Sequence, residues 1–128
     1  MLRAAGVVLK KDNKYLLVQE KKQIVFGLWN WPGGRIDEGE TAERCAVREA
    51  MEEVSLNIRL VKSLGEWPTD SSKGDSKMLF LGEIIDGVIA IKEDELLDAR
   101  WFTKDEILGM KDKLRSQWVA ASLEQGLC

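Results

Sequence analysis

The sequence has 128 residues, of which 45% are hydrophobic and 32% charged, a length and composition typical of one globular domain. Its net charge of -3 argues against nucleic acid as a partner, because proteins that bind a phosphate backbone usually carry a basic face. The chain has no histidine, which excludes His-containing triads and HExxH sites, and its two cysteines form no disulfide framework.

The N-terminal apolar run, MLRAAGVVLKK, is far shorter than a signal peptide needs, and no apolar run reaches membrane-spanning length. We therefore expect a cytoplasmic protein without a membrane partner, organised as a single domain over residues 1–128. The sequence leaves open whether the protein forms a homodimer.

The first part of the chain alternates apolar runs with polar turns, which is typical of strands. The predicted elements are a hairpin of strands Ala4–Lys10 and Tyr15–Gln19 around the turn 11–14, a loop at 20–23 and a strand at 24–31. Trp29 and Trp31 share a face of that strand, since alternate residues point the same way. Pro32-Gly33-Gly34 then predicts a turn.

A helix is predicted from Thr41 to Val54. Later elements are a strand-like segment at 57–65, a polar loop at 66–77, strands at 78–85, 88–91 and 98–102, and terminal helices at 104–110 and 114–123. Strands on both sides of a buried helix predict an α/β/α sandwich on a mixed sheet. The polar loop, from Trp67 to Lys77, is expected to act as a lid or specificity loop.

The predicted helix carries carboxylates into an apolar setting. On a helical wheel, Glu49 and Glu53 share a side with small residues, and Glu52 lies at its edge. A second apolar stripe consists of Val47, Ala50, Met51 and Val54. A helix that is apolar on two sides is normally buried between layers, where carboxylates four residues apart repel each other strongly. A positive charge is therefore expected between them.

Hard divalent cations suit such a cluster, because Mg²⁺ and Mn²⁺ prefer carboxylate oxygens. The other interpretation is a solvated acidic helix face on which Arg44 and Arg48 form salt bridges. The wheel alone leaves both interpretations open.

The spacing of this segment resembles the Nudix box, the signature of the Nudix hydrolases. The matching residues are Gly34, Glu40, Arg48, Glu49, Glu52, Glu53 and Leu56. The segments WNWPGG upstream and DELLDARWF downstream resemble further parts of the family pattern. Ser55 departs from it, because the family usually has a glycine there that leaves the helix at positive φ. Serine is expected to do so at modest cost.

The resemblance implies the Nudix α/β/α fold and hydrolysis of a phosphoanhydride in a nucleoside diphosphate linked to another group. It implies Mg²⁺, with Mn²⁺ as a substitute, bound by Glu49, Glu52, Glu53 and Glu40. Arg48 would hold one glutamate through a bidentate contact. A carboxylate would accept the proton of the attacking water. We expect Glu53 first in this role and Glu95 second, although Glu95 also fits a solvated turn.

Several residues near the box are candidates for substrate binding. Gly33 and Gly34 permit close backbone approach. Arg35 and Arg3 are candidate phosphate contacts or plain surface charges. Three tryptophans, Trp29, Trp31 and Trp67, are candidates to stack on a planar ring, but tryptophans at strand ends also fill cores.

The C-terminal segments ARWFTKDEI and LRSQWVAASLEQG resemble small Nudix phosphatases that act on nucleoside di- and triphosphates or thiamine-pathway pyrophosphates. A MutT-like enzyme that releases pyrophosphate from triphosphates is the nearest rival. An ADP-ribose or dinucleotide pyrophosphatase comes next. A non-catalytic nucleotide-binding or sensor Nudix domain belongs to another class. Such domains usually lack box glutamates, all of which are present here.

Overall fold

The structure is a computed structural model that describes residues 1–69, 73–126 and 128. Its strands are β1 (Leu2–Lys11), β2 (Lys14–Glu20), β3 (Trp29–Asn30), β4 (Gly33–Arg35), β5 (Asn57–Pro68), β6 (Ser76–Asp86) and β7 (Leu96–Thr103). Its helices are α1 (Ala42–Val54), α2 (Lys104–Leu108) and α3 (Gln117–Glu124), with 3-10 turns η1 (Gln23–Val25) and η2 (Lys111–Lys113). No helix in these described ranges is long and apolar enough to cross a membrane.

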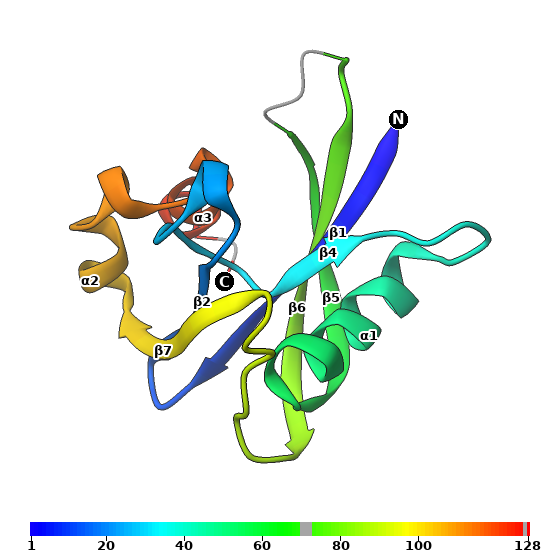
Figure 1. Cartoon of the computed structure of the whole chain (residues 1–128). Coiled ribbons are helices and arrows are strands. Elements are labelled where there is room, and N and C mark those ends of the chain that lie inside the picture. Colours follow the sequence, from blue (N-terminus) through cyan, green and yellow to red (C-terminus); the bar gives the residue numbers. More distant parts are fainter. Residues whose placement is uncertain (70–72, 127) are drawn as a thin grey trace.

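Strand β1 is the centre of the sheet because both of its edges are paired. One edge pairs in parallel with β6, which pairs antiparallel with β5. The other edge is shared: residues 4–6 pair with β4, whereas Lys10 and Lys11 pair with β2, which also carries β3 and β7. The sheet therefore forks beside β1 (Figure 1).

Helices cover both faces of the sheet. Val7 and Val8 are neighbours on β1 and point to opposite faces. Val7 packs in the core beneath α1, together with Ala46, whereas Val8 packs in a second core with Val119 of α3. The expected α/β/α sandwich on a mixed sheet is confirmed (Figure 1).

The predicted hairpin is confirmed, since β1 and β2 pair antiparallel across residues 10–15. Its turn places Asp12 and Asn13 at φ 52° and 62°. Two consecutive residues at positive φ form the turn that matches strand twist, and Asp and Asn tolerate this conformation best after glycine.

The predicted strand at 24–31 is wrong over most of its length, because only Trp29–Asn30 is a strand and Gln23–Val25 is a 3-10 turn. Two apolar residues in its first half do not face a core: Ile24 is 96% exposed and Phe26 is 61% exposed. The predicted strand at 88–91 is also wrong. The backbone N–H of Ala90 instead donates to a carbonyl at the end of α1, so this segment is tied to the helix rather than to a sheet edge.

The polar segment at 66–77, predicted as a loop, is strand at both of its ends. Strand β5 runs to Pro68 and β6 starts at Ser76, with Trp67 opposite Lys77. Cross-strand pairing satisfies the backbone here whatever the polarity of the side chains. Part of the proposed lid, residues 70–72, lies outside the described residues.

Helix α1 matches its prediction and begins after Thr41, whose Oγ1 accepts a hydrogen bond from the N–H of Arg44 at 3.1 Å. Ser55 ends the helix in the left-handed conformation at φ 63°, as expected for the position where the family usually has glycine. Its Oγ donates to the carbonyl of Ala90 at 2.9 Å. The second predicted apolar stripe is only partly buried, because Met51 is 47% exposed. The helix is therefore buried on one side and not between layers.

The terminal helices are shorter than predicted. Helix α2 ends at Leu108, and α3 begins only at Gln117. Leu114 is not helical because it forms a bridge with Trp29, and the N–H of Arg115 donates to the carbonyl of Trp29 at 2.7 Å. This connection ties the start of α3 to β3 and so to the fork of the sheet.

Candidate active site

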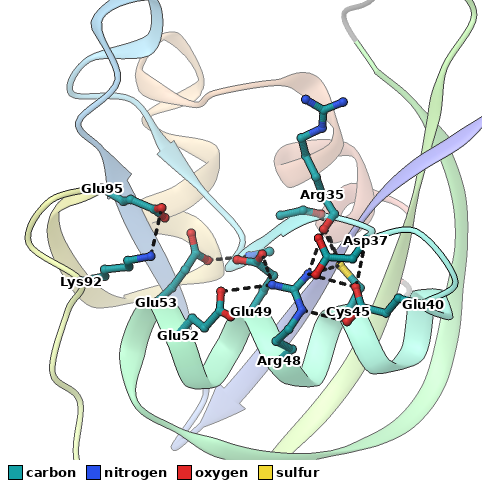
Figure 2. A network of polar contacts seen from close by, with 12 residues as sticks. Arg35, Asp37, Glu40, Cys45, Arg48, Glu49, Glu52, Glu53, Lys92 and Glu95 are labelled. Atoms are coloured by element: carbon teal, nitrogen blue, oxygen red, sulfur yellow. Dashed lines mark hydrogen bonds and ion pairs between the residues drawn. The ribbon is translucent and has the colours of Figure 1, made fainter.

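A cavity of about 140 Å³ lies in the fork of the sheet, and we call it the carboxylate cavity. Its lining residues are Glu20, Lys22, Gly33, Gly34, Arg35, Glu49, Glu53 and Glu95. They come from β2 and the loop after it, from β4, from α1 and from the segment before β7. These elements meet where one edge of β1 is shared between β4 and β2. In the view of Figure 2, Glu49 and Glu53 lie between Arg48 on one side and Glu95 on the other.

Arg48 is the hub of the acidic residues on the outer side of this cavity. Its guanidinium binds Glu40 in a bidentate manner, with Nε to Oε2 at 2.8 Å and Nη2 to Oε1 at 3.0 Å. Nη1 also donates to Glu49 at 2.9 Å and to Glu52 at 3.1 Å. Nη2 reaches the carbonyl of Arg35 at 3.0 Å, which fastens α1 to β4 (Figure 2). The bidentate contact expected of Arg48 is therefore present, and its partner is Glu40.

These contacts stabilise the charged forms of both Glu40 and Arg48. The Arg48 guanidinium, together with the backbone N–H of Asp37, lowers the pKa of Glu40 from its ordinary 4.5 to about 2. The same hydrogen bonds raise the pKa of Arg48. Glu40 is thus a carboxylate at any physiological pH, and both of its oxygens accept hydrogen bonds from Arg48.

Glu53 has the opposite environment. It is 6% exposed, and its Oε1 accepts a hydrogen bond from the N–H of Gly33 at 2.8 Å. Burial raises the pKa of Glu53 from 4.5 to about 8, and the charges of Glu49, Glu20 and Glu95 add to this rise. Burial also raises the pKa of Glu49. A cluster of carboxylates that cannot all ionise without help is the setting in which a cation binds favourably.

The two glycines of β4 are needed for different reasons. A Cβ on Gly33 would lie 2.4 Å from the carbonyl oxygen of Ala5 and 2.6 Å from the Cα of Gly6, so the sheet itself leaves no room. A Cβ on Gly34 would lie 2.4 Å from the carboxyl carbon of Glu49. Gly34 therefore lets the Glu49 carboxylate approach the strand, as the prediction of close backbone approach required.

The donors fit a hard divalent cation by their chemistry, since they are all carboxylate oxygens. Within the described ranges, no three acidic or cysteine side chains converge in a geometry that would already hold a metal ion. Glu40, Glu49 and Glu52 turn their oxygens toward Arg48 instead. Glu49 and Glu53 both line the cavity; Glu53 is buried and Glu49 is partly buried.

Glu95 lines the carboxylate cavity, so it is not confined to a solvated turn. Its Oε1 accepts a hydrogen bond from Nζ of Lys92 at 3.2 Å, an exposed pair that leaves the side chain near the protein surface. Lys92 is in turn fixed by its backbone N–H, which donates to the carbonyl of Glu53 at 3.0 Å. Glu95 and Glu53 thus face one cavity from two segments.

The tryptophans lie mainly in the core. Trp29 is 7% exposed and meets Phe102 edge to face, and Trp31 is 1% exposed and packs near Tyr15. Neither presents an open ring face to the carboxylate cavity. Trp67 is partly buried against the same core. Arg35 lines the cavity, whereas Arg3 pairs with Asp75 on the surface.

A second cavity of about 220 Å³ opens from the first, and we call it the side cavity. Its lining includes residues that sequence reasoning missed, namely Glu20, Lys22, Asn30, Lys77, Arg115 and Trp118. The sequence pattern could have indicated that Lys77 points inward. Lys77 alternates with Leu79 and Leu81 and so lies on the same inward face of β6. Asn30, between two tryptophans, is the other polar residue in an apolar context.

A family model described as "NUDIX domain" matches residues 1–122. The chain is 32% identical over 99 residues to the "Putative 8-oxo-dGTP diphosphatase" of Bacillus subtilis (strain 168), which covers 77% of this chain and 64% of that protein. It is 31% identical over 108 residues to the "NAD-capped RNA hydrolase NudC" of Pseudomonas aeruginosa (strain LESB58), which covers 83% of this chain and 38% of that protein. The chain thus spans less than two thirds of these relatives.

Solved structures are also similar to this chain. A NUDIX hydrolase from Nitrosomonas europaea has a TM-score of 0.85 and 25% identity, covering 96% of this chain and 85% of that chain. A MutT NUDIX hydrolase from Burkholderia pseudomallei has a TM-score of 0.79 and 24% identity, covering 98% of both chains. The similarity to the Burkholderia pseudomallei protein, at 24% identity, shows only that the two folds are alike.

Proposed function

The chain belongs to the Nudix hydrolase family, and from that premise we propose that it hydrolyses a phosphoanhydride bond in a nucleoside di- or triphosphate or a related pyrophosphate. The observation that carries the proposal is the carboxylate cavity. It places Glu49 and Glu53 beneath the glycine backbone of β4, with Arg48 holding the surrounding acidic residues. A phosphate chain can approach there without a side chain of Gly33 or Gly34 in its way.

Nudix hydrolases generally need a divalent metal ion, and we propose Mg²⁺, with Mn²⁺ as a substitute. The proposed ligands are Glu49, Glu52, Glu53 and Glu40. When bound, the ion would neutralise phosphate oxygens and acidify an attacking water. Arg48 holds the carboxylates of Glu40, Glu49 and Glu52 close to one another before any ion arrives.

Glu53 is the first choice for the proton acceptor. Its burial and its raised pKa favour proton uptake near neutral pH, and the N–H of Gly33 fixes one of its oxygens. Glu95 is the second choice, because it reaches the same cavity from the segment before β7. Arg35, which also lines the cavity, is the proposed phosphate contact.

The relatives support different substrates. A relative described as an 8-oxo-dGTP diphosphatase favours the MutT-like reading, in which a triphosphate loses pyrophosphate. A relative described as an NAD-capped RNA hydrolase favours a dinucleotide or an ADP-ribose-like substrate and keeps nucleic acid open as a substrate. The small-phosphatase reading rests on the C-terminal resemblance. A cytoplasmic location and a homodimer also remain predictions.

A substrate panel with Mg²⁺ tests the proposal. It contains nucleoside triphosphates, their oxidised forms, diphosphates, ADP-ribose, dinucleoside polyphosphates and thiamine-pathway pyrophosphates, with products identified by chromatography. Orthophosphate release would support the small-phosphatase reading, and release of pyrophosphate would support the MutT-like one. Cleavage of ADP-ribose or dinucleotides alone would contradict both. No cleavage while metal is bound would favour a nucleotide-binding or sensor domain.

Variants of α1 test the assignment of residues. Glu52→Gln and Glu53→Gln should each lose most of the rate while keeping the fold, whereas Glu43→Gln, an exposed glutamate on the same helix, should keep wild-type activity. Full turnover in EDTA, or in both site variants, would falsify the metal assignment.

A further inference from the structure

The segment between Ile91 and Leu96 is a tight turn that carries Glu95 to the carboxylate cavity, and we call residues 92–95 the acidic turn. The N–H groups of Glu95 and Leu96 both donate to the carbonyl of Lys92 at 2.9 Å. The chain is anchored on both sides of the turn in the core beneath α1, since Leu96 is 2% exposed and Ile91 packs against the same cluster. The turn itself has only polar side chains, so hydrogen bonds rather than apolar packing hold it in place.

One side of the acidic turn is fastened to the end of α1. The N–H of Lys92 donates to the carbonyl of Glu53 at 3.0 Å, and the N–H of Ala90 donates to the carbonyl of Val54 at 3.1 Å. The last carbonyls of a helix have no partner within the helix, so these bonds satisfy both groups. The turn therefore meets α1 at Glu53, whose carboxylate lines the same cavity as Glu95.

The other side of the acidic turn is fastened to the end of β2 through Lys21. The backbone N–H of Lys21 donates to the carbonyl of Glu95 at 3.2 Å, and its Nζ donates to the carbonyl of Glu93 at 2.9 Å. Two hydrogen bonds from one residue to two carbonyls fix the direction of the turn as well as its distance from β2.

A β-bulge lies beside the turn. Strand β2 pairs with β7 in regular register as far as Gln19, which lies opposite Asp98, but Glu20 then lies opposite Leu96. Leu97 is thus the extra residue of a bulge. Bulges bend a strand, redirect side chains and occur often next to active sites. Lys21 keeps β2 and the turn together just beyond the point where regular pairing has ended.

The Glu95 carboxylate has a partner within the turn. Its Oε1 accepts a hydrogen bond from Nζ of Lys92 at 3.2 Å, and Figure 2 shows this pair beside Glu53. An exposed ion pair of this kind contributes little to stability, but it favours one direction of the side chain. Where the carboxylate lies relative to the cavity then depends on where the backbone of the turn is held.

We propose that Lys21 is a positioning residue for hydrolysis, which holds the acidic turn against β2 so that the Glu95 carboxylate faces the carboxylate cavity. This inference rests on the proposed function, because it takes Glu95 to act on the substrate or the attacking water. Lys21 is not one of the residues that line the cavity, so its effect on the reaction passes through Glu95. Displacing an active-site group by about 1 Å can cost roughly 100-fold in rate.

Substitution of Lys21 tests the effect on the reaction. Lys21→Met removes the bond from Nζ and keeps the backbone bond, so it should lower kcat about 3- to 10-fold on the best substrate of the panel, with KM little changed. Lys21→Arg keeps a charged donor and should restore most of the rate. Lys62→Met, at an exposed position on β5, is the control and should keep the wild-type kcat.

A double-mutant cycle tests whether Lys21 acts through Glu95. Glu95→Gln should lower kcat by about 100-fold, the low end of the effect of a positioned proton acceptor. Adding Lys21→Met to Glu95→Gln should cost nothing further, because the group that Lys21 positions is already lost. Losses that multiply would mean that Lys21 acts elsewhere, for example on the phosphates of the substrate, and would overturn the inference. Wild-type kcat in Glu95→Gln would also overturn it.

Amide hydrogen exchange measures how firmly the turn is held, without any turnover. The amides of Lys92 and Glu95 should exchange about 5-fold faster in Lys21→Met, since one hydrogen bond of the turn is lost. The amide of Cys45, which bonds to the carbonyl of Thr41 in α1, is the internal control and should exchange at the wild-type rate. Unchanged exchange at Lys92 and Glu95 would overturn the inference.

The two assays separate this inference from the proposed function. If the wild type cleaved no substrate while Lys21→Met loosened the turn, the hydrolase proposal would fail and the holding of the turn by Lys21 would stand. Metal-dependent cleavage with wild-type kcat in Lys21→Met would leave the hydrolase and refute the positioning role.

Discussion

Adjacent glycines of β4 provide a matched pair of substitutions whose effects should separate activity from stability. In Gly34→Ala, the new Cβ would lie 2.4 Å from the carboxyl carbon of Glu49, whereas ordinary van der Waals contact begins near 3.4 Å. The carboxylate must therefore retreat by about 1 Å (3.4 − 2.4 = 1.0). A displacement of about 1 Å in an active site can cost roughly 100-fold in rate.

Glu49 can retreat because its carboxyl is the end of a flexible side chain, so Gly34→Ala should fold normally. The loss of glycine freedom in the unfolded chain even favours folding by about 0.4–1 kcal/mol. In Gly33→Ala the Cβ would instead lie 2.4 Å from the carbonyl oxygen of Ala5 in the neighbouring strand. Backbone cannot rotate away, and overpacking of this kind typically costs about 1–3 kcal/mol or more.

The assay combines urea unfolding with kcat/KM on the best substrate of the panel. We expect Gly34→Ala to keep its unfolding midpoint and lose about 100-fold in kcat/KM, and Gly33→Ala to lose stability first. A further variant, Gly34→Ala with Glu49→Gln, should be little worse than Glu49→Gln alone, because both changes act on one carboxylate. Wild-type activity in Gly34→Ala would refute the argument that Glu49 must lie against β4.

Three further predictions concern stability. Ser55→Ala and Ser55→Gly both lose the hydrogen bond to Ala90, but only alanine keeps the strain of φ 63°. Ser55→Ala should therefore unfold about 1 kcal/mol more easily than Ser55→Gly in urea, and equal midpoints would contradict this. In EDTA, stability should fall as pH rises from about 4.5 to 8, because burial raises the pKa of Glu53 to about 8 and the unfolded chain releases that proton first. Added Mg²⁺ should oppose the fall, and thermal melts of Glu53→Gln should show a shallower pH dependence than the wild type. Thr103→Ala breaks the capping box with Glu106 at the start of α2 and should cost about 1 kcal/mol by the same urea assay, whereas Thr103→Ser should not.

Structural features that depend only on residues close together in the chain could be predicted from the sequence alone. The hairpin at Asp12-Asn13, helix α1 from its Thr41 cap, and the spacing from Gly34 to Glu53 all depend on neighbours within one turn or one helix. The acidic residues and Arg48 were identified from the resemblance of this spacing to the Nudix box, without tertiary contacts. The same holds for Ser55, whose left-handed conformation follows from its place at the end of the helix.

Tertiary structure decided which apolar residues are buried and which residues meet across the fork. Ile24, Phe26 and Met51 have the hydrophobicity of core residues but face outward, because none of the described elements covers them. Lys77 and Trp118 meet only because β6 pairs with β1 and α3 packs on the same face. Contacts between residues far apart in the chain depend on strand order and helix placement, which no local pattern encodes. The acidic half of the site was thus visible in the sequence, and the cavity beside it was not.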